Sequence, residues 1–201
     1  MDNPCAIINR MGHIHTEEGQ HDHTVGAYII REDEGEPKLI LHMHKKMEIL
    51  LQFGGHVELN ETPWQAVVHE VREESGYDID QLNVLQPKER IKKLTGTVSD
   101  VAGKTEHLTG AVLHPYPVVL DTHIIKPGHY HSNDSFACVT DQKPKQSVDE
   151  GESTDMRLLT RDEVAQLSDE QIPPSVRETA LFIFDVCLPN WERVDTSEFK
   201  S

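Results

Sequence analysis

One predicted helix, between Thr62 and Gly76, constrains the fold of this chain more than any other part of its sequence. Thr62 can cap the helix, Gln65 completes a capping box, and Pro63 suits the first helical position. Glycine, here Gly76, is the residue that most often ends a helix. Apolar side chains recur at i, i+3, i+4 and i+7 and form one stripe, made of Trp64, Val67, Val68 and Val71. We expect this stripe to lie on a sheet.

Runs of β-branched and aliphatic residues, separated by turn residues, predict the strands of that sheet. The expected strands span residues 24–32, 37–44, 47–53, 115–125, 135–142 and 155–159. Residues 126–134 are expected to form a turn, and residues 93–110 a loop insertion. Further helices are predicted over residues 87–94, 160–167 and 174–188. Strands and helices that share one chain in this order indicate an α/β protein.

The length of 201 residues suits one domain with extensions. Residues 1–23 are polar and rich in histidine and are expected to form a loose N-terminal arm. Residues 24–188 are expected to form the domain, and residues 189–201 a polar, mobile C-terminal tail. The sequence shows no internal repeat and no second domain.

The balance of charge excludes some partners. The chain has 19 Lys and Arg against 35 Asp and Glu, a formal net charge of −16, which repels nucleic acid backbones and anionic membranes. No apolar run approaches the length of a membrane span, and the N-terminus lacks the pattern of a secretion signal. The three cysteines, Cys5, Cys138 and Cys187, are scattered, which favours a reducing compartment. We therefore expect a cytoplasmic protein that binds neither nucleic acid nor membrane; its quaternary state stays open, a homodimer included.

Three carboxylates lie close together on the predicted helix. Glu70, Glu73 and Glu74 occupy positions i, i+3 and i+4 and flank its apolar stripe, although like charges at this spacing destabilise a helix by a few tenths of a kcal/mol. A solvated helix face is the ordinary explanation for such a cluster. Here the Gly54-Gly55 pair lies just upstream, where backbone can approach a ligand, and Glu61 lies at the helix entrance. Carboxylates gathered around one point suit a hard cation such as Mg²⁺, which removes their repulsion.

The stretch from Gly55 to Tyr77 resembles the Nudix box. That motif is a glycine, five residues, a glutamate and seven residues, followed by Arg-Glu-aliphatic-x-Glu-Glu-x-Gly-aliphatic. Every spacing holds, at Gly55, Glu61, His69, Glu70, Val71, Glu73, Glu74, Gly76 and Tyr77. Two residue types depart from the motif, because His69 stands where the family has arginine and Tyr77 where it has an aliphatic residue.

The resemblance implies a Nudix-type α/β/α sandwich with a mixed β-sheet. It also implies a hydrolase that cleaves a diphosphate linkage in a nucleoside diphosphate derivative, with Mg²⁺ as cofactor and Mn²⁺ as an alternative. By the same resemblance the metal ligands would be Glu70, Glu73, Glu74 and the backbone carbonyl near Gly54. The catalytic carboxylates would be Glu70, Glu73, Glu61 and, from a loop outside the box, Glu152.

Further candidate site residues lie outside the Nudix box. A general base is often supplied from outside the box in this family, and the candidates here are Glu150, Glu152, His129, His131 and Asp134. Lys45, Lys46 and His131 are expected to contact the phosphates of a nucleotide-type substrate. Loop acids, histidines and turn lysines are otherwise most often just solvated.

His69 keeps two classes of function open. Arginine is a permanent forked cation, whereas histidine is shorter and titrates near neutral pH, although His69 can still reach Glu73 at i, i+4. We favour an active hydrolase because all four glutamates remain. The alternative is a Nudix-fold nucleotide-binding or regulatory module with weak or no catalysis.

Among the 13 histidines, four pairs have the form His-x-His, at positions 13/15, 21/23, 42/44 and 129/131. Residues i and i+2 of a strand share one face, which is favourable geometry for zinc or nickel. A transition-metal site built from the N-terminal arm and the 129/131 pair is one interpretation. The other is a polar surface with incidental pairs, of which 42/44 lies nearest the expected site.

Overall fold

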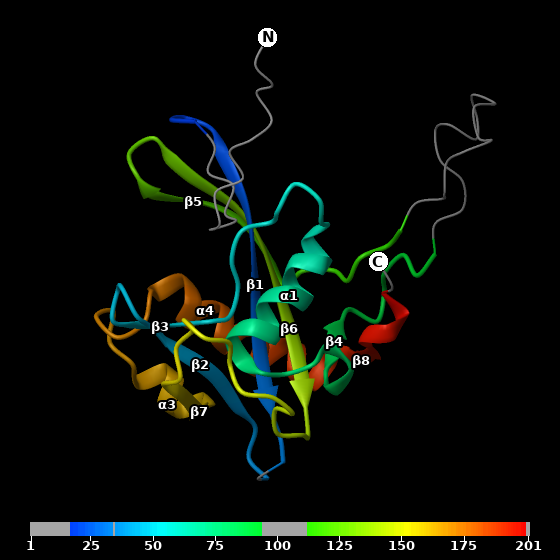
Figure 1. Ribbon diagram of the computed structural model, residues 1–201. Helices are drawn as coiled ribbons and strands as arrows, with labels where there is room; N and C mark the ends of the chain where they lie inside the picture. The colour runs from blue at the N-terminus through cyan, green and yellow to red at the C-terminus, as the bar shows by residue number, and fades with distance from the viewer. Residues whose placement is uncertain (1–16, 34, 94–111, 200–201) are drawn as a thin grey trace, which may run out of the picture.

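A computed structural model describes residues 17–33, 35–93 and 112–199 of the chain (Figure 1). The strands are β1 (His21–Arg31), β2 (Lys38–His44), β3 (Ile49–Leu51), β4 (Asn83–Gln86), β5 (Val119–Lys126), β6 (His129–Thr140), β7 (Met156–Thr160) and β8 (Glu192–Asp195). The helices are α1 (Pro63–Ser75), α3 (Arg161–Gln166), α4 (Pro174–Phe182) and α5 (Leu188–Asn190), with a π-helical turn, η2 (Ile183–Cys187), between the last two. Two short 3₁₀ helices are η1 (Ile79–Gln81) and η3 (Thr196–Glu198).

Within the described residues the strands form one mixed sheet. Its order is β3-β2-β1-β6-β4-β8, with β5 paired to β6 and β7 paired to β2. The central pair, β1 and β6, is parallel over its whole length, from His21 opposite Tyr130 to Arg31 opposite Thr140. The other strand pairs are antiparallel.

Helices cover both faces of this sheet, with α1 in front and α4 behind in Figure 1. Side chains alternate along β1, so Val25, Ala27 and Ile29 join the core under α1, whereas Tyr28 and Ile30 join the core under α4. The two helices therefore bury their apolar stripes on opposite faces of the sheet. The predicted α/β/α sandwich with a mixed sheet is confirmed.

The helix predicted between Thr62 and Gly76 forms as α1. Thr62 caps α1, and both hydrogen bonds of the capping box with Gln65 are present. Gly76 ends the helix in the left-handed conformation, with φ of +73°. Trp64, Val67 and Val71 are buried in the core under α1, and Val68 packs against it. Tyr77 is 1 % exposed in the same core, and its hydroxyl donates to the carbonyl of Gln142 at 2.9 Å, so an aromatic ring fills the expected aliphatic position.

Several predicted boundaries are wrong. Residues 129–134 are not a turn but the start of β6, because they pair with β1 on one side and with β5 on the other. Residues 87–93 form no helix, because this charged stretch has no apolar stripe to bury, and Arg90 instead bonds to the carbonyl of Pro87 and to Glu192. The predicted strand 47–53 shortens to β3. The predicted loop insertion lies almost entirely outside the described residues.

The two ends of the chain also differ from expectation. β1 begins at His21, so the last residues of the expected arm belong to the sheet. The expected mobile tail contains β8, which pairs with β4 and buries Val194 at 4 % exposure. Phe199 packs on the core under α1. A four-residue edge strand with one buried side chain is too short to show the alternation by which a strand is predicted from sequence.

In the part of the chain that the structure covers, no helix combines the length and apolarity that crossing a membrane requires.

Candidate active site

The glycine pair lies in a loop that runs beside β1. The backbone NH of Val25 donates to the carbonyl of Gly55 at 2.9 Å, and Ala27 forms an isolated antiparallel bridge with Phe53. Gly54 has φ of +143°, and a Cβ placed on it would lie 2.1 Å from the carbonyl oxygen of Val25. Only glycine fits there, because any side chain would collide with the backbone of the central strand.

Glu74 reaches from α1 to this loop. Its Oε2 accepts a hydrogen bond from the NH of Gly54 at 2.7 Å, and the residue is 9 % exposed. Burial raises the pKa of Glu74 to about 8; the bond from Gly54 lowers it, and the charges of Glu70, Glu152 and Glu73 raise it further. On its other side, Nδ1 of His42 lies 3.8 Å from Oε1 of Glu74. Burial lowers the pKa of His42 to about 4, so this imidazole is neutral at pH 7.

Glu70 lies over the second glycine of the pair. A Cβ on Gly55 would lie 2.1 Å from Oε1 of Glu70 and 2.6 Å from its Cδ, so the carboxyl group occupies the space that a side chain would need. Burial raises the pKa of Glu70 to about 7; His69 lowers it, and the charges of Glu73, Glu152 and Glu61 raise it. The buried carboxyl group of Glu74 and the half-buried one of Glu70 therefore converge on the Gly54-Gly55 loop.

His69 lies between the other two box glutamates. Its Nε2 is 2.9 Å from Oε1 of Glu73, and its Nδ1 is 3.7 Å from Oε2 of Glu61. Partial burial lowers the pKa of His69, but the charge and hydrogen bond of Glu73 and the charges of Glu70 and Glu61 outweigh it, so the pKa is raised. Oε1 of Glu61 accepts from the NH of Glu58 at 2.9 Å, which fixes that carboxylate at the helix entrance. A histidine thus contacts both carboxylates that an arginine would be expected to orient.

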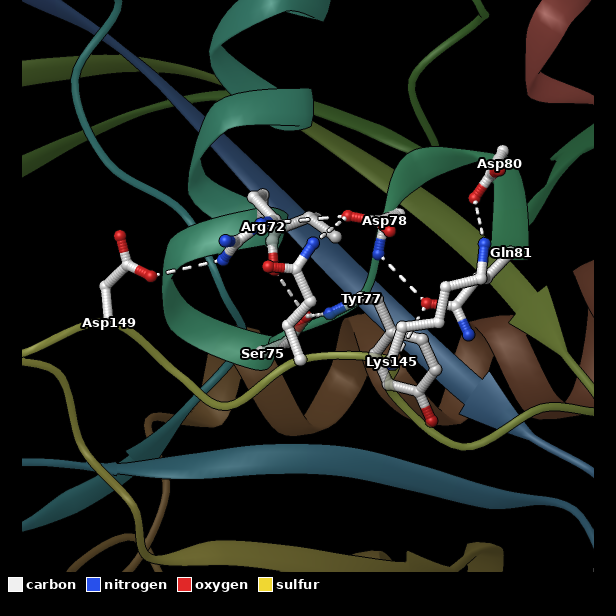
Figure 2. Close-up of polar contacts among 10 residues, drawn as sticks. Arg72, Ser75, Tyr77, Asp78, Asp80, Gln81, Lys145 and Asp149 are labelled. Atoms are coloured by element: carbon white, nitrogen blue, oxygen red, sulfur yellow. Dashed lines mark hydrogen bonds and ion pairs between the residues drawn. The ribbon is translucent and has the colours of Figure 1, made fainter.

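The loop before β7 docks on the carboxyl end of α1. Nη1 of Arg72 donates to Asp149 at 3.1 Å, as Figure 2 shows, and the NH of Asp149 donates to the carbonyl of Glu73 at 2.9 Å. The NH of Glu152 in turn donates to the carbonyl of Asp149 at 3.1 Å. These bonds hold Glu152 near enough for its charge to raise the pKa values of Glu70 and Glu74. Sequence reasoning named Glu152 but missed Arg72, whose role depends on a contact 77 residues away.

The donor set fits a hard divalent cation. Carboxylate oxygens are the ligands that Mg²⁺ prefers. Burial and the neighbouring carboxylates raise the pKa values of Glu70 and Glu74, and a bound cation would offset both effects. In this structure the carboxylate oxygens of Glu70, Glu73 and Glu74 do not lie around one point. Among the described residues, one group of three potential ligands lies within 4.8 Å of one another, and it is elsewhere, at Asp22, His129 and His131. Glu73 is turned toward His69. Binding an ion here would draw the carboxylates together.

The expected substrate-binding residues are not brought to one point. Nζ of Lys45 donates to the carbonyl of Gly151 at 2.5 Å, next to Glu152, and Lys46 is exposed in a turn. The ring of His131 packs against His56, His123 and His129 instead. Phosphate binding by these three residues stays a prediction. Sequence reasoning placed His42 nearest the site among the paired histidines, and the structure puts it beside Glu74.

The first testable consequence concerns Gly55. Gly55→Ala is expected to lower kcat/KM about tenfold or more, because the new methyl group must displace the Glu70 carboxyl group, and a catalytic group moved by 1 Å can cost a hundredfold. The free energy of unfolding should change by less than about 1 kcal/mol, because the displaced atoms are the end of a flexible side chain. Initial rates and urea unfolding measure the two quantities.

A double-mutant cycle provides the control. If Gly55→Ala acts through Glu70, the double variant Gly55→Ala/Glu70→Gln should be almost as active as Glu70→Gln alone. Full additivity of the two losses would show that the methyl group acts by another route.

The second consequence is a pH dependence of the metal-free protein. Glu70 and Glu74 have folded-state pKa values of about 7 and about 8, above the ordinary 4.5. The folded chain therefore holds these protons more tightly than the unfolded chain, and the stability linked to them is present below the ordinary pKa and lost as pH rises through 7 and 8. The loss should be on the order of 6 kcal/mol between pH 5 and pH 9.

Urea unfolding in the presence of a chelator measures this dependence. The matched variant is Glu70→Gln/Glu74→Gln, which keeps the shapes of the two side chains and removes both titrating groups. The difference in stability between the original chain and this variant should change with pH as stated. Parallel curves for the two proteins would contradict the assignment.

Comparisons with known proteins show the family and support the fold. The NUDIX domain family matches residues 20–179. A hydrolase of the NUDIX family from Clostridium perfringens superposes with a TM-score of 0.61 at 24% identity, over 83% of this chain and 98% of that one. An Ap4A hydrolase from C. elegans gives 0.56 at 16% identity, over 84% and 98%, and a NUDIX hydrolase from Nitrosomonas europaea gives 0.53 at 19% identity, over 90% and 97%. No curated protein matches the sequence.

Proposed function

The chain belongs to the NUDIX domain family, the hydrolases of phosphoric anhydrides, and we propose that it cleaves a diphosphate linkage in a nucleoside diphosphate derivative with Mg²⁺ as its cofactor. The observation that carries the proposal is the pair of carboxyl groups, Glu74 buried and Glu70 half-buried, that converge on the Gly54-Gly55 loop. Burial and mutual repulsion raise the pKa values of both groups, and a bound cation would offset both effects.

Glu70, Glu73 and Glu74 would hold the ion, together with backbone oxygen of the glycine loop. When bound, Mg²⁺ supplies positive charge against the phosphate oxygens and makes a water molecule more acidic. The NH of Gly54 holds Glu74 in place, and Glu61 with His69 positions Glu73. Because the chemistry of phosphoryl transfer demands mostly positioning and charge stabilisation, residues that fix carboxylates contribute directly to the rate.

Glu152 is our candidate for the general base. It reaches the site on a loop that is bonded to α1 through Asp149 and to Lys45 through Gly151. Its charge acts on both Glu70 and Glu74, whereas Glu150 has no comparable effect on them. A carboxylate in this position can accept the proton of the attacking water. Lys45 would then serve the reaction by holding the loop, whether or not it also meets a phosphate.

Turnover on a panel of substrates tests the proposal. Nucleoside triphosphates, ADP-ribose and dinucleoside polyphosphates are incubated with the protein in Mg²⁺ or in a chelator, and products are separated by chromatography. We expect hydrolysis of a phosphoric anhydride in at least one compound, lost with the chelator and restored by Mg²⁺. Tight binding of a nucleotide without any product would instead establish the binding or regulatory module as the function.

Variants of His69 decide how much its substitution for arginine matters. His69→Ala is expected to lower kcat/KM about tenfold or more, because Glu73 and Glu61 lose the group between them. His69→Arg restores a forked cation and should keep or raise the rate of the original chain. If His69→Arg alone converts an inactive protein into a hydrolase, His69 is the reason that the natural chain only binds.

A further inference from the structure

A second group of metal-ligand side chains lies at the end of the sheet where β1, β5 and β6 run side by side (Figure 1). Asp22 on β1 is paired with His131 on β6, and His131 is paired with His123 on β5. Paired residues of neighbouring strands point to the same face, and so do residues two apart on one strand, which adds His129. The pairing of β1, β5 and β6 therefore places these side chains together on one face of the sheet.

The ligand atoms of the cluster lie near enough to one another for a single ion. One ligand atom each from Asp22, His129 and His131 can be chosen so that all lie within 4.8 Å of one another. Oδ2 of Asp22 is 3.6 Å from Nδ1 of His129 and 3.5 Å from Nε2 of His56. Tetrahedral zinc, with bonds of 2.0–2.1 Å to nitrogen, separates neighbouring ligand atoms by about 3.4 Å. Asp22 is 2 % exposed, so its carboxylate faces these histidines rather than solvent.

This cluster is distinct from the glutamate site. Along β1, Asp22 shares the face of Tyr28 and Ile30, which lie in the core under α4. Glu70 and Glu74 lie on α1, which covers the opposite face. The backbone links the two sites, because His56 is paired with Thr24 and follows Gly55 directly in the chain.

We propose that Asp22, His129 and His131 bind one divalent transition-metal ion of the zinc type. Imidazole nitrogens select zinc, nickel or copper, whereas Mg²⁺ prefers oxygen, so the two sites should take different ions. Three protein ligands leave a fourth position, and His56 lies next to the triad with its ring edge-to-face against His131.

The side chains of His129 and His131 are adjacent at this sheet end. Nε2 of His129 and Nε2 of His131 are 3.1 Å apart, so the two rings present nitrogens to one point. A cation bound there would also neutralise the buried carboxylate of Asp22.

The proposed ion would join the start of β1 to the start of β6, two segments more than 100 residues apart in the chain. It would also lie beside His56, at the edge of the loop that carries Gly54 and Gly55. Its role is thus structural, holding the sheet end and the glycine loop in register, and it stands independently of the reaction at the glutamates.

Metal content and cobalt absorption test the site without reference to activity. The full chain, expressed without a polyhistidine tag, is stripped with a chelator and titrated with Zn²⁺ by calorimetry and with Co²⁺ by visible absorption. We expect one equivalent of Zn²⁺, a tetrahedral cobalt spectrum, and a melting temperature raised by Zn²⁺. His131→Gln and Asp22→Asn should each weaken Zn²⁺ binding about a hundredfold or more, because each removes a ligand.

Two matched variants locate the ion. His13→Ala/His15→Ala removes another His-x-His pair, and Glu74→Gln removes a carboxylate of the glutamate site; both should keep full Zn²⁺ affinity. Far-UV circular dichroism checks that each variant is folded. The proposal is overturned if the unmodified chain binds no Zn²⁺ more tightly than Mg²⁺, or if the His13→Ala/His15→Ala variant loses the ion while His131→Gln keeps it.

Discussion

Glu74→Gln is expected to lower kcat about a hundred- to a thousandfold, with little effect on the fold. The amide has the shape of the carboxyl group, and its oxygen can still accept the hydrogen bond from the NH of Gly54. What it lacks is the negative charge that would hold the cation. In the metal-free protein the same change should even stabilise the fold at high pH, because burial disfavours the charged carboxylate at this position.

Initial rates over a range of Mg²⁺ concentrations measure this effect. The matched control is Glu178→Gln, which makes the same chemical change at an exposed residue of α4 and should leave kcat unchanged. The account requires that the loss at Glu74 come with a weaker apparent affinity for Mg²⁺. Equal rates for Glu74→Gln and Glu178→Gln would remove Glu74 from the active site.

Gly54→Ala is expected to destabilise the protein by about 3 kcal/mol or more, the largest effect on stability that we foresee for one methyl group. Two costs combine at this position. A φ of +143° is strained for any residue with a Cβ, and the new atom would lie 2.1 Å from the backbone oxygen of Val25. The neighbouring backbone belongs to the central strand β1 and cannot move aside without breaking its ladder with β6.

Urea unfolding with a constant m-value measures the loss. Gly35→Ala separates the two costs, because Gly35 also has a positive φ, of +95°, but a Cβ there would meet nothing within 4 Å. It should cost only about 1 kcal/mol, the conformational part alone. Equal destabilisation by the two variants would mean that the contact with Val25 contributes nothing.

Much of the fold and of the glutamate site could be predicted because the evidence is local. Thr62, Gln65 and Gly76 define the ends of α1 within one stretch of chain, and the spacing of Glu70, Glu73 and Glu74 fixes their common flank. The ladder of β6 could not be read in the same way. Residues 129–134 alternate polar side chains on both faces, so only their pairing with β1 shows that they are strand.

The same limit explains the contacts that sequence reasoning missed. Arg72 meets Asp149 across a loop, and Asp22 meets His129 through strands far apart in the chain. The periodicity of the sequence does not predict such contacts, because they depend on how segments far apart in the chain pair in the fold. The histidine pair at 129/131 was recognised as a candidate ligand set, but its partner Asp22 is visible only in the assembled sheet.

The proposed hydrolase requires the carboxylates beside the Gly54-Gly55 loop to hold divalent cations against a pyrophosphate group. Anomalous scattering from crystals soaked with Mn²⁺ and a non-hydrolysable nucleotide measures this directly. We expect manganese between the phosphate oxygens and the carboxylates of Glu70 and Glu74. A bound nucleotide with no metal at these carboxylates, or manganese only at the Asp22 cluster, would contradict the account.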